Sequence, residues 1–428
     1  MKNKIENFFE NKFLKNMTYI FSGTMIGSML GLFNTGLLVK ALGLEKNGII
    51  FLGLSYAAFF NQLFNFQSYE AIIKFLPSCM DYGNEKGKNY IQQAIILDVG
   101  TAIAAFLVSY LLVDLSGGYF KWSGEVKGYI RILTVTILFT LTGAFRGVLR
   151  IFEKFKEISW INVCTNGMNT LFYLIGFILK LELIYYIYFT AISIFLSNLL
   201  VISYVWKTLK ENGMSDLNFN RTRFDREFLK FCIYTNLSST VDLPVFQITP
   251  FIINKYLGFS DVAVYKILEK IGGLITKVTS TMVQVLRPEI SKRLSSGDED
   301  GAYRIGFKIG KIVLGVGVMG FLFVALTHRY WLGHLIPNYE NYMVSIYLYL
   351  FLTIFTEAFS GQHPIFIYSG HVKENTILLI VVNSIYMVIL LYLTRLLGIK
   401  GIIISLIIQA GMVFTIQGII LRKERRRN

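Results

Sequence analysis

Long apolar runs separated by short polar segments cover almost the whole chain. A helix needs about 20 mostly apolar residues to cross a bilayer, and at that length the pattern predicts about 12 transmembrane helices. The expected ranges are 17–39, 48–73, 91–113, 129–150, 158–180, 183–206, 230–254, 262–286, 306–327, 343–367, 375–397 and 399–421. We therefore expect an all-α, polytopic membrane protein.

Composition supports this assignment. Of the 428 residues, 54% are hydrophobic and 16% are charged, against roughly a quarter charged in soluble domains. These values exclude a disordered chain and argue against a soluble enzyme. The cysteines Cys79, Cys164 and Cys232 show neither a pairing pattern nor metal spacing, and the four histidines form no metal motif. We therefore expect no catalytic residues, no metal site and no cofactor.

The basic residues indicate the orientation of the chain. It has 42 Lys and Arg against 27 Asp and Glu, a formal net charge of +15. With the N-terminus in the cytoplasm, 28 basic residues fall on inside segments and helix ends and 10 on outside ones. This split follows the positive-inside rule and predicts an even number of spans with both termini in the cytoplasm. Topology explains the excess charge, so nucleic acid is not an expected partner.

A weak internal repeat divides the chain. The segment Val39–Leu44 (VKALGL) recurs 215 residues later as Asn254–Phe259 (NKYLGF), and each copy joins a first span to a second. Both copies run in the same direction, which predicts two parallel six-helix lobes around a central cavity, a transporter architecture. The expected division is 1–206 for the N-terminal lobe, 207–229 for a cytoplasmic linker and 230–428 for the C-terminal lobe.

The eighth span carries the most informative polar pattern. At about 100° per residue, polar residues share one side of the helix and apolar residues the other. The polar side holds Lys266, Lys270, Gly273, Lys277, Ser280, Thr281 and Gln284, with Glu269 at its edge. Each charge at mid-bilayer costs roughly 2.5–3.5 kcal/mol, so three lysines must face water or an anion. Structural pairing with Glu269 is an alternative that neutralises only one of them.

Other spans carry quieter polar faces. The groups that share a side are Asn61 and Asn65 in the second span and Asn162, Asn166, Asn169 and Tyr173 in the fifth, and Arg146 lies in the fourth. Such faces either line a hydrated cavity or form hydrogen bonds between helices. Acids within or beside spans are candidates for ion coupling or for counter-charge to the lysines: Glu70, Asp98, Asp242, Glu269 and Glu357.

Prolines and glycines predict where helices bend and where they pack closely. Pro244 and Pro250 in the seventh span, and Gly361 with Pro364 in the tenth, predict bends or breaks. The spacing Gly23-xxx-Gly27-xxx-Gly31 in the first span is typical of close helix packing.

Two stretches resemble the bacterial O-antigen and capsule repeat-unit flippases of the multidrug/oligosaccharidyl-lipid/polysaccharide exporter superfamily. The first, Gly23 to Pro77, contains LVKALGLEKNGIIFLGLS and AIIKFLP, and the second, Asn254 to Asp298, contains NKYLGFSDVAVYKILEKIGG and RPEISKRLSSGD. The resemblance implies a V of two six-helix lobes that moves undecaprenyl-pyrophosphate-linked oligosaccharide from the inner to the outer leaflet. Relatives often carry an acid in the seventh span where this chain has Thr249, which weakens an ion-coupling role there.

The residues and the resemblance together predict an alternating-access flippase for surface polysaccharide biosynthesis. Arg146, Lys266, Lys270 and Lys277 would bind the pyrophosphate, while the Asn faces, Tyr173 and Gln284 would bind sugar hydroxyls. The expected partners are the lipid-linked oligosaccharide and membrane lipids, with Na⁺ or H⁺, a polymerase and glycosyltransferases as candidates. The alternatives are an ion-coupled drug exporter of the same superfamily, whose cavity should carry acids, and a polysaccharide polymerase or glycosyltransferase, which needs larger outside loops.

Overall fold

A computed structural model describes residues 2–79, 85–140 and 143–425. Within the helices, the side chains of residues 2–17, 20, 280–288 and 295 lie outside this description. The described residues form helices and connecting turns and contain no β-strand. The expected all-α class is confirmed.

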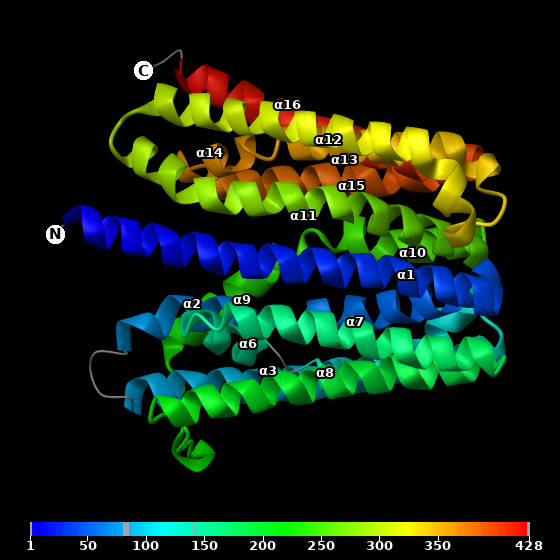
Figure 1. The fold of residues 1–428 in the computed structure, drawn as a ribbon, viewed down its shortest axis with the longest axis horizontal. Coiled ribbons are helices and arrows are strands. Elements are labelled where there is room, and N and C mark those ends of the chain that lie inside the picture. Colours follow the sequence, from blue (N-terminus) through cyan, green and yellow to red (C-terminus); the bar gives the residue numbers. More distant parts are fainter. Residues whose placement is uncertain (1, 80–84, 141–142, 426–428) are drawn as a thin grey trace. The chain divides into compact units, whose positions relative to one another are not determined.

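The chain separates into two compact units (Figure 1). Unit 1 comprises 1–42 and 49–243, and unit 2 comprises 43–48 and 244–428. The helices of unit 1 are α1 (Lys2–Phe64), α2 (Ser68–Phe75), α3 (Glu85–Phe120), α4 (Gly124–Thr134), α5 (Thr136–Phe139), α6 (Gly143–Ile151), α7 (Phe155–Ile178), α8 (Leu183–Glu211) and α9 (Arg226–Thr240). Those of unit 2 are α10 (Thr249–Tyr256), α11 (Phe259–Ser295), α12 (Glu299–Leu335), α13 (Met343–Ala358), α14 (Gln362–Tyr368), α15 (Val372–Leu397) and α16 (Ile399–Arg425).

Each predicted span coincides with helix, and four of the spans are interrupted. The second span breaks between α1 and α2, the fourth around α5, the seventh at a π-helical turn (Pro244–Ile248), and the tenth between α13 and α14. The bends predicted at Pro244 and at Gly361 are confirmed. At the first break Asn236 of α9 donates to the carbonyls of Gln62 and Asn65, because a buried backbone carbonyl needs a partner.

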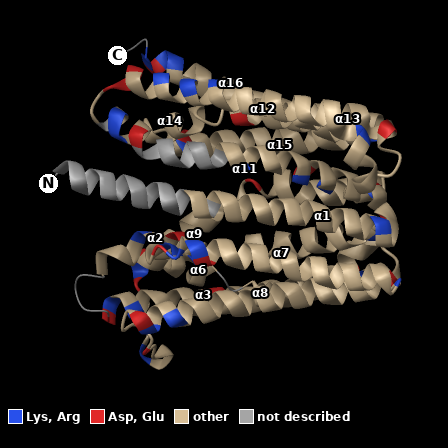
Figure 2. Cartoon of the chain, in the orientation of Figure 1, with Lys and Arg blue, Asp and Glu red and all other residues tan. Residues whose placement is uncertain are grey.

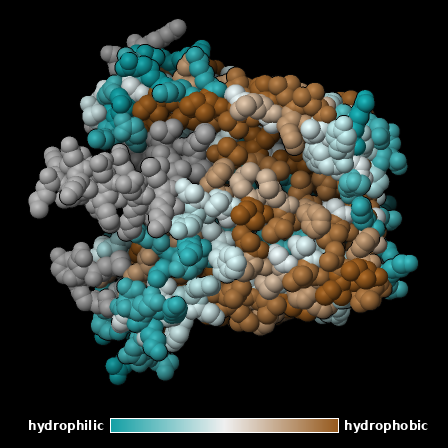
Figure 3. All heavy atoms as spheres, viewed as in Figure 1, coloured by the Kyte–Doolittle hydropathy of each residue, from teal (hydrophilic) through white to brown (hydrophobic). Residues whose placement is uncertain are grey.

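The apolar surface of the helices is typical of a multi-pass membrane protein. Among the described residues, eight helical segments are long and apolar enough to cross a membrane. The predicted spans that fall short are the fifth and eighth, in which polar residues interrupt the apolar runs, and the seventh, which is divided between the short helices α9 and α10. Charged residues gather toward the helix ends (Figure 2), and within each unit hydrophobic side chains cover the middle of the helices (Figure 3).

The two copies of the sequence repeat adopt the same backbone turn. Gly43 has φ 76° and ψ 175°, and Gly258, its counterpart 215 residues later, has φ 105° and ψ −179°. Only glycine visits this region at low cost. Each glycine ends one helical stretch and begins the next, so the repeat extends from sequence to local structure.

The glycine face of α1 packs on α7. A Cβ at Gly23 would lie 2.4 Å from the Cβ of Ser159, and one at Gly27 would lie 3.4 Å from Asn166 Nδ2. Nothing larger than glycine fits at Gly23, so the predicted close packing is confirmed.

The boundary between the two units differs from the expected one. The predicted C-terminal lobe begins at 230, whereas α9 packs with unit 1 and the division falls after Leu243. The physical reason is that Phe228 and Cys232 are buried in one apolar cluster with Ile72 and Leu76 of unit 1. Residues of the predicted linker also bind α3, since Gln93 accepts a hydrogen bond from the backbone of Asp225.

Candidate functional site

Helix α11 is amphipathic over its described residues from Tyr265 to Thr279. Ile267, Leu268, Ile271 and Ile275 on its apolar side are at most 8% exposed. Gly272 on this side touches α13, because a Cβ there would lie 2.6 Å from Thr353 Oγ1. Lys266, Lys270 and Lys277 lie on the other side and are partly exposed. Packing on the apolar side therefore orients the lysines.

The lysine side of α11 is open around its middle. A Cβ at Gly273, between Lys270 and Lys277, would meet no heavy atom within 4 Å. This glycine therefore leaves space beside the two lysines. Gln284, which the sequence places on the same side, has a side chain outside the described residues.

A carboxylate and three tyrosines lie at one end of the lysine row. Lys266 Nζ donates to Glu269 Oε2 at 2.7 Å. The same carboxylate interacts electrostatically with Tyr265, Tyr349 and Tyr386. Glu269 is thus paired with Lys266 in this structure, and its role as a counter-charge stays a prediction.

Thr249 takes part in this polar cluster. Its Oγ1 lies 2.7 Å from the hydroxyl of Tyr386 on α15, and both side chains are fully buried. At the position where relatives often carry an acid, this chain therefore has a neutral threonine that forms a hydrogen bond with a tyrosine. Sequence reasoning missed the tyrosines, because they lie on three different helices and interrupt no apolar pattern.

Glu357 of α13 contacts α11 near Lys277, at Thr276 and Thr279. It accepts a hydrogen bond from Thr279, a fully buried residue of α11. The bond joins α13 to the packed side of α11, just before α13 ends at Ala358. Glu357 therefore acts as a contact between helices in this structure.

Three predicted polar residues of unit 1 do come together. Asn61, Asn65 and Asp98 line a small recess with Thr101, Thr140 and Gly143. Asp98 Oδ2 accepts a hydrogen bond from the backbone N–H of Ala144 at 2.8 Å. The acid therefore binds the first turn of α6 at the interruption of the fourth span, where unpaired N–H groups favour a carboxylate.

The Asn face of α7 serves helix packing. Asn34 of α1 donates from Nδ2 to the carbonyl of Asn166 at 2.9 Å and accepts from Thr170 at 2.7 Å. The Asn166 side chain donates to the carbonyl of Asn162. Tyr173 is 5% exposed and its hydroxyl lies 2.7 Å from Thr190 of α8. Tyr173 and Asn166 thus form contacts between helices in this structure, the alternative to lining a cavity.

The remaining predicted residues are scattered over unit 1. Two buried polar atoms have no hydrogen-bond partner among the described residues: Nε of Arg146 on α6 and Oδ1 of Asn169 on α7. Glu70 is exposed on α2. Asp242 follows the end of α9 and takes part in polar contacts.

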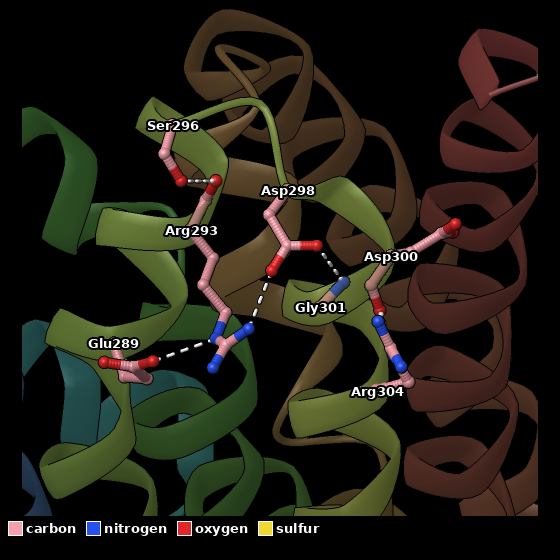
Figure 4. Close-up of polar contacts among 7 residues, drawn as sticks. All are labelled: Glu289, Arg293, Ser296, Asp298, Asp300, Gly301 and Arg304. Carbon is pink, nitrogen blue, oxygen red and sulfur yellow. Dashed lines mark hydrogen bonds and ion pairs between the residues drawn. The ribbon is translucent and has the colours of Figure 1, made fainter.

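The segment RPEISKRLSSGD ends α11 and leads through an ion-paired turn into α12 (Figure 4). Arg293 donates to Glu289 at 2.8 Å and to Asp298 at 2.7 Å, and Asp298 accepts from the N–H of Gly301 at 2.8 Å. The Gly301 N–H and the Arg293 guanidinium lower the pKa of the Asp298 carboxyl. The turn thus fixes the start of α12. Among the described residues no group of three His, Cys, Asp or Glu side chains is suited to a metal ion.

The sequence matches the polysaccharide biosynthesis protein family over residues 13–294, about two thirds of its length. The chain belongs to this family. No curated protein sequence matches it.

Solved transporter structures share the fold across nearly the whole chain. An inward-facing multidrug resistance MATE family transporter of the MOP superfamily has a TM-score of 0.75 at 16% identity, covering 93% of this chain and 94% of that one. An outward-facing MATE structure has a TM-score of 0.70 at 17% identity, with coverages of 96% and 95%. The lipid II flippase MurJ, in an inward closed conformation, has a TM-score of 0.71 at 16% identity, with coverages of 94% and 87%. At these identities the likeness shows the fold, which is that of MOP-superfamily transporters.

Proposed function

We propose that the protein is a flippase that moves an undecaprenyl-pyrophosphate-linked oligosaccharide across the cytoplasmic membrane for surface polysaccharide synthesis. The single observation that carries the proposal is the lysine row of α11, three lysines on the open side of a helix whose other side is packed. Membership of a polysaccharide biosynthesis family supports a saccharide cargo, and the similarity to a lipid II flippase fold supports a lipid-linked one.

The charge on the lysine row fits a diphosphate. The row comprises three lysines and Glu269, which pairs with Lys266. Moving a dianion through the bilayer without such compensation would be very costly. An inside-negative potential also favours outward movement of anions, by about 2.3 kcal/mol per charge per 100 mV. Transport then requires no separate Na⁺ or H⁺ gradient. For the orientation of the chain, we propose that both termini are cytoplasmic.

Arg146, Asn61 and Asn65 of unit 1 are proposed as further polar contacts for the cargo. The unpaired Nε of Arg146 supports its inclusion, and the shared recess supports the two asparagines. The other α7 asparagines are secondary candidates, since Asn166 is engaged in packing.

The test is complementation of a flippase-deficient strain that produces surface polysaccharide. Lys270→Ala and Lys277→Ala should abolish polymer display at unchanged protein level in the membrane. Lys308→Ala, on the exposed side of α12, is the matched control and should leave display intact. Normal display in both α11 variants would overturn the proposal. Loss of drug efflux without loss of polymer would instead favour the drug exporter, whose fold is the same.

A further inference from the structure

An apolar groove runs along α12 and is walled by α13, α14 and α16 of unit 2. Its volume is about 730 Å³, within the usual range for pockets that bind one small molecule or lipid chain. The lining includes Phe307 and Leu314 of α12, Phe351, Phe355 and Phe359 of α13, and Gly418 of α16. Phe307 is 68% exposed and Phe351 is 51% exposed. The groove therefore presents exposed aromatic rings.

Direct contacts between helices hold the groove walls in place. A Cβ at Gly310 would lie 2.6 Å from the carbonyl oxygen of Ala358, so α12 touches the backbone of α13. On the other wall Gln362 donates to the carbonyl of Phe414 at 2.8 Å, and the rings of Phe359 and Phe414 stack 5.2 Å apart. The groove is thus preformed and needs no rearrangement of α13 or α16 to accept a chain.

The charged residues that line the groove are all basic. They are Lys311, Arg422 and Arg425, and no Asp or Glu is among its described lining residues. Arg425 pairs with Asp300 and lies over the ring of Tyr303 at 5.4 Å, at the end where α12 begins and α16 ends. Arg422 is one turn away on the same helix and is exposed. The Lys311 ammonium lies over the ring of Phe307 at 4.7 Å, and its long stem allows it to reach polar surroundings.

The length of the groove matches one leaflet of a bilayer. Tyr303 and Leu314, near its two ends, are separated by 11 residues of α12, which is about 16 Å of helix. Half of a hydrocarbon core about 30 Å thick is about 15 Å. A chain that begins at the arginines and follows the phenylalanines would therefore end near the middle of the membrane.

We propose that this groove is a binding site for an anionic phospholipid of one leaflet. Its phosphate would bind Arg422 and Arg425, and one acyl chain would lie against Phe307, Phe355 and Phe359. This proposal is independent of the transported cargo. The charge complementarity selects an anionic headgroup over a zwitterionic one, and the length selects a leaflet lipid over a longer isoprenoid.

The experiment uses the full-length protein in phosphatidylcholine vesicles doped with a phosphatidylglycerol that carries a photoactivatable group on one acyl chain. Cross-linked peptides are mapped by mass spectrometry. The expected labels fall on groove residues of α12, α13 and α16. Arg422→Gln and Arg425→Gln should each reduce this labelling about fivefold, since one basic residue near the surface contributes about that factor.

A second variant fills the groove without touching the charges. A Cβ at Gly418 would have only Gln362 Nε2 within 4 Å, at 3.7 Å, so Gly418→Leu should fold and should abolish the labelling. The matched controls are Gly315→Leu, with open space around its Cβ, and Lys423→Gln, which is exposed beside Arg422; both should label as the unmodified protein does.

Three outcomes would overturn the proposal. They are unchanged labelling in Gly418→Leu and in the arginine variants, equal labelling by a photoactivatable phosphatidylcholine, and displacement of the probe by a long-chain isoprenyl phosphate in preference to phosphatidylglycerol. The last outcome would assign the groove to the tail of the cargo.

Discussion

The second spans of the two repeats begin at matching glycine turns and then diverge in chemistry. At the repeat offset of 215 residues, Lys266, Lys270 and Lys277 of α11 correspond to Phe51, Ser55 and Gln62 of α1. Phe51 and Ser55 are buried, and Gln62 donates to the carbonyl of Ser239 within unit 1. The same turn therefore leads into a packed, uncharged helix in unit 1 and into a charged, partly open helix in unit 2.

The comparison separates scaffold from function. The glycine turn and the helix that follows it are needed in both repeats, because they define the fold. The lysines occur in one repeat only, at the cost of placing charge in a membrane. The charge of the lysines is costly in a membrane and is absent from the equivalent helix. Binding of a cargo explains it better than folding does.

The largest expected effect comes from making the two spans alike. The triple variant Lys266→Phe, Lys270→Ser and Lys277→Gln carries the unit 1 residues in α11. It should weaken binding of a purified isoprenyl diphosphate about a hundredfold, since each basic residue contributes about 1 kcal/mol to binding an anionic lipid headgroup. Titration calorimetry in detergent measures the change. The control is Gln62→Ala with Ser55→Ala, which should bind as the unmodified protein does. If the triple variant bound the isoprenyl diphosphate as tightly as the unmodified protein does, the difference between the two spans would have no role in binding.

The glycine turns should respond alike in the two repeats. Gly43→Ala and Gly258→Ala each force alanine into a region that costs about 1–3 kcal/mol, and neither Cβ meets an atom within 4 Å. Both variants should therefore lose similar stability through the backbone alone, as measured by thermal unfolding of the purified protein. Gly100→Ala, in α3 with equally open surroundings, is the control and should not destabilise. A loss at only one of the two turns would argue against a structural repeat.

The interrupted fourth and tenth spans offer a second comparison. Asp98 binds the N–H of Ala144 in unit 1, and Glu357 binds Thr279 in unit 2. If both acids are anchors, Asp98→Asn and Glu357→Gln should keep an acceptor oxygen and retain transport. Asp98→Ala should lower the free energy of unfolding by about 0.5–2 kcal/mol, as the loss of a helix cap does. Abolished transport in Asp98→Asn at unchanged stability would show instead that the acid couples an ion.

The smallest effect is expected at the turn between α11 and α12. Folding lowers the pKa of Asp298, through the Gly301 N–H and then Arg293. Its contribution to stability is therefore present at neutral pH and is lost as the pH falls below the ordinary carboxyl value of 3.8. The melting temperature of Asp298→Asn should be slightly below that of the unmodified protein at pH 7, and the difference should shrink as the pH is lowered below 3.8. Glu85, at the start of α3 in unit 1, pairs with Lys88 on the surface, and the melting temperature of Glu85→Gln should change less. A difference that grows on acidification would contradict the assignment.

Much of the fold could be predicted because the membrane imposes strong constraints on sequence. Apolar runs of the required length located each span, prolines located the interruption at 244–248, and glycine spacing located the contact between α1 and α7. The periodicity of α11 also gave its two sides, since a packed side must be apolar. These are local properties that the chain carries within one helix.

The polar contacts could not be predicted to the same degree, because they join distant segments. Tyr173 was expected in a cavity and lies buried against Thr190, since an Asn and Tyr face serves packing as readily as binding. The tyrosines around Glu269 come from α11, α13 and α15, and only the fold brings them together. The boundary at Leu243 depended likewise on the packing of Phe228 and Cys232, which no composition change marks.

The central claim is that the lysine row recognises the diphosphate of the cargo. The most direct measurement is translocation in proteoliposomes of a fluorescent oligosaccharide carried on undecaprenyl diphosphate, compared with the same oligosaccharide on neutral undecaprenol. The account predicts that the protein moves the diphosphate form and not the neutral one, and that the triple α11 variant moves neither. Equal transport of both forms, or full transport by the triple variant, would contradict it.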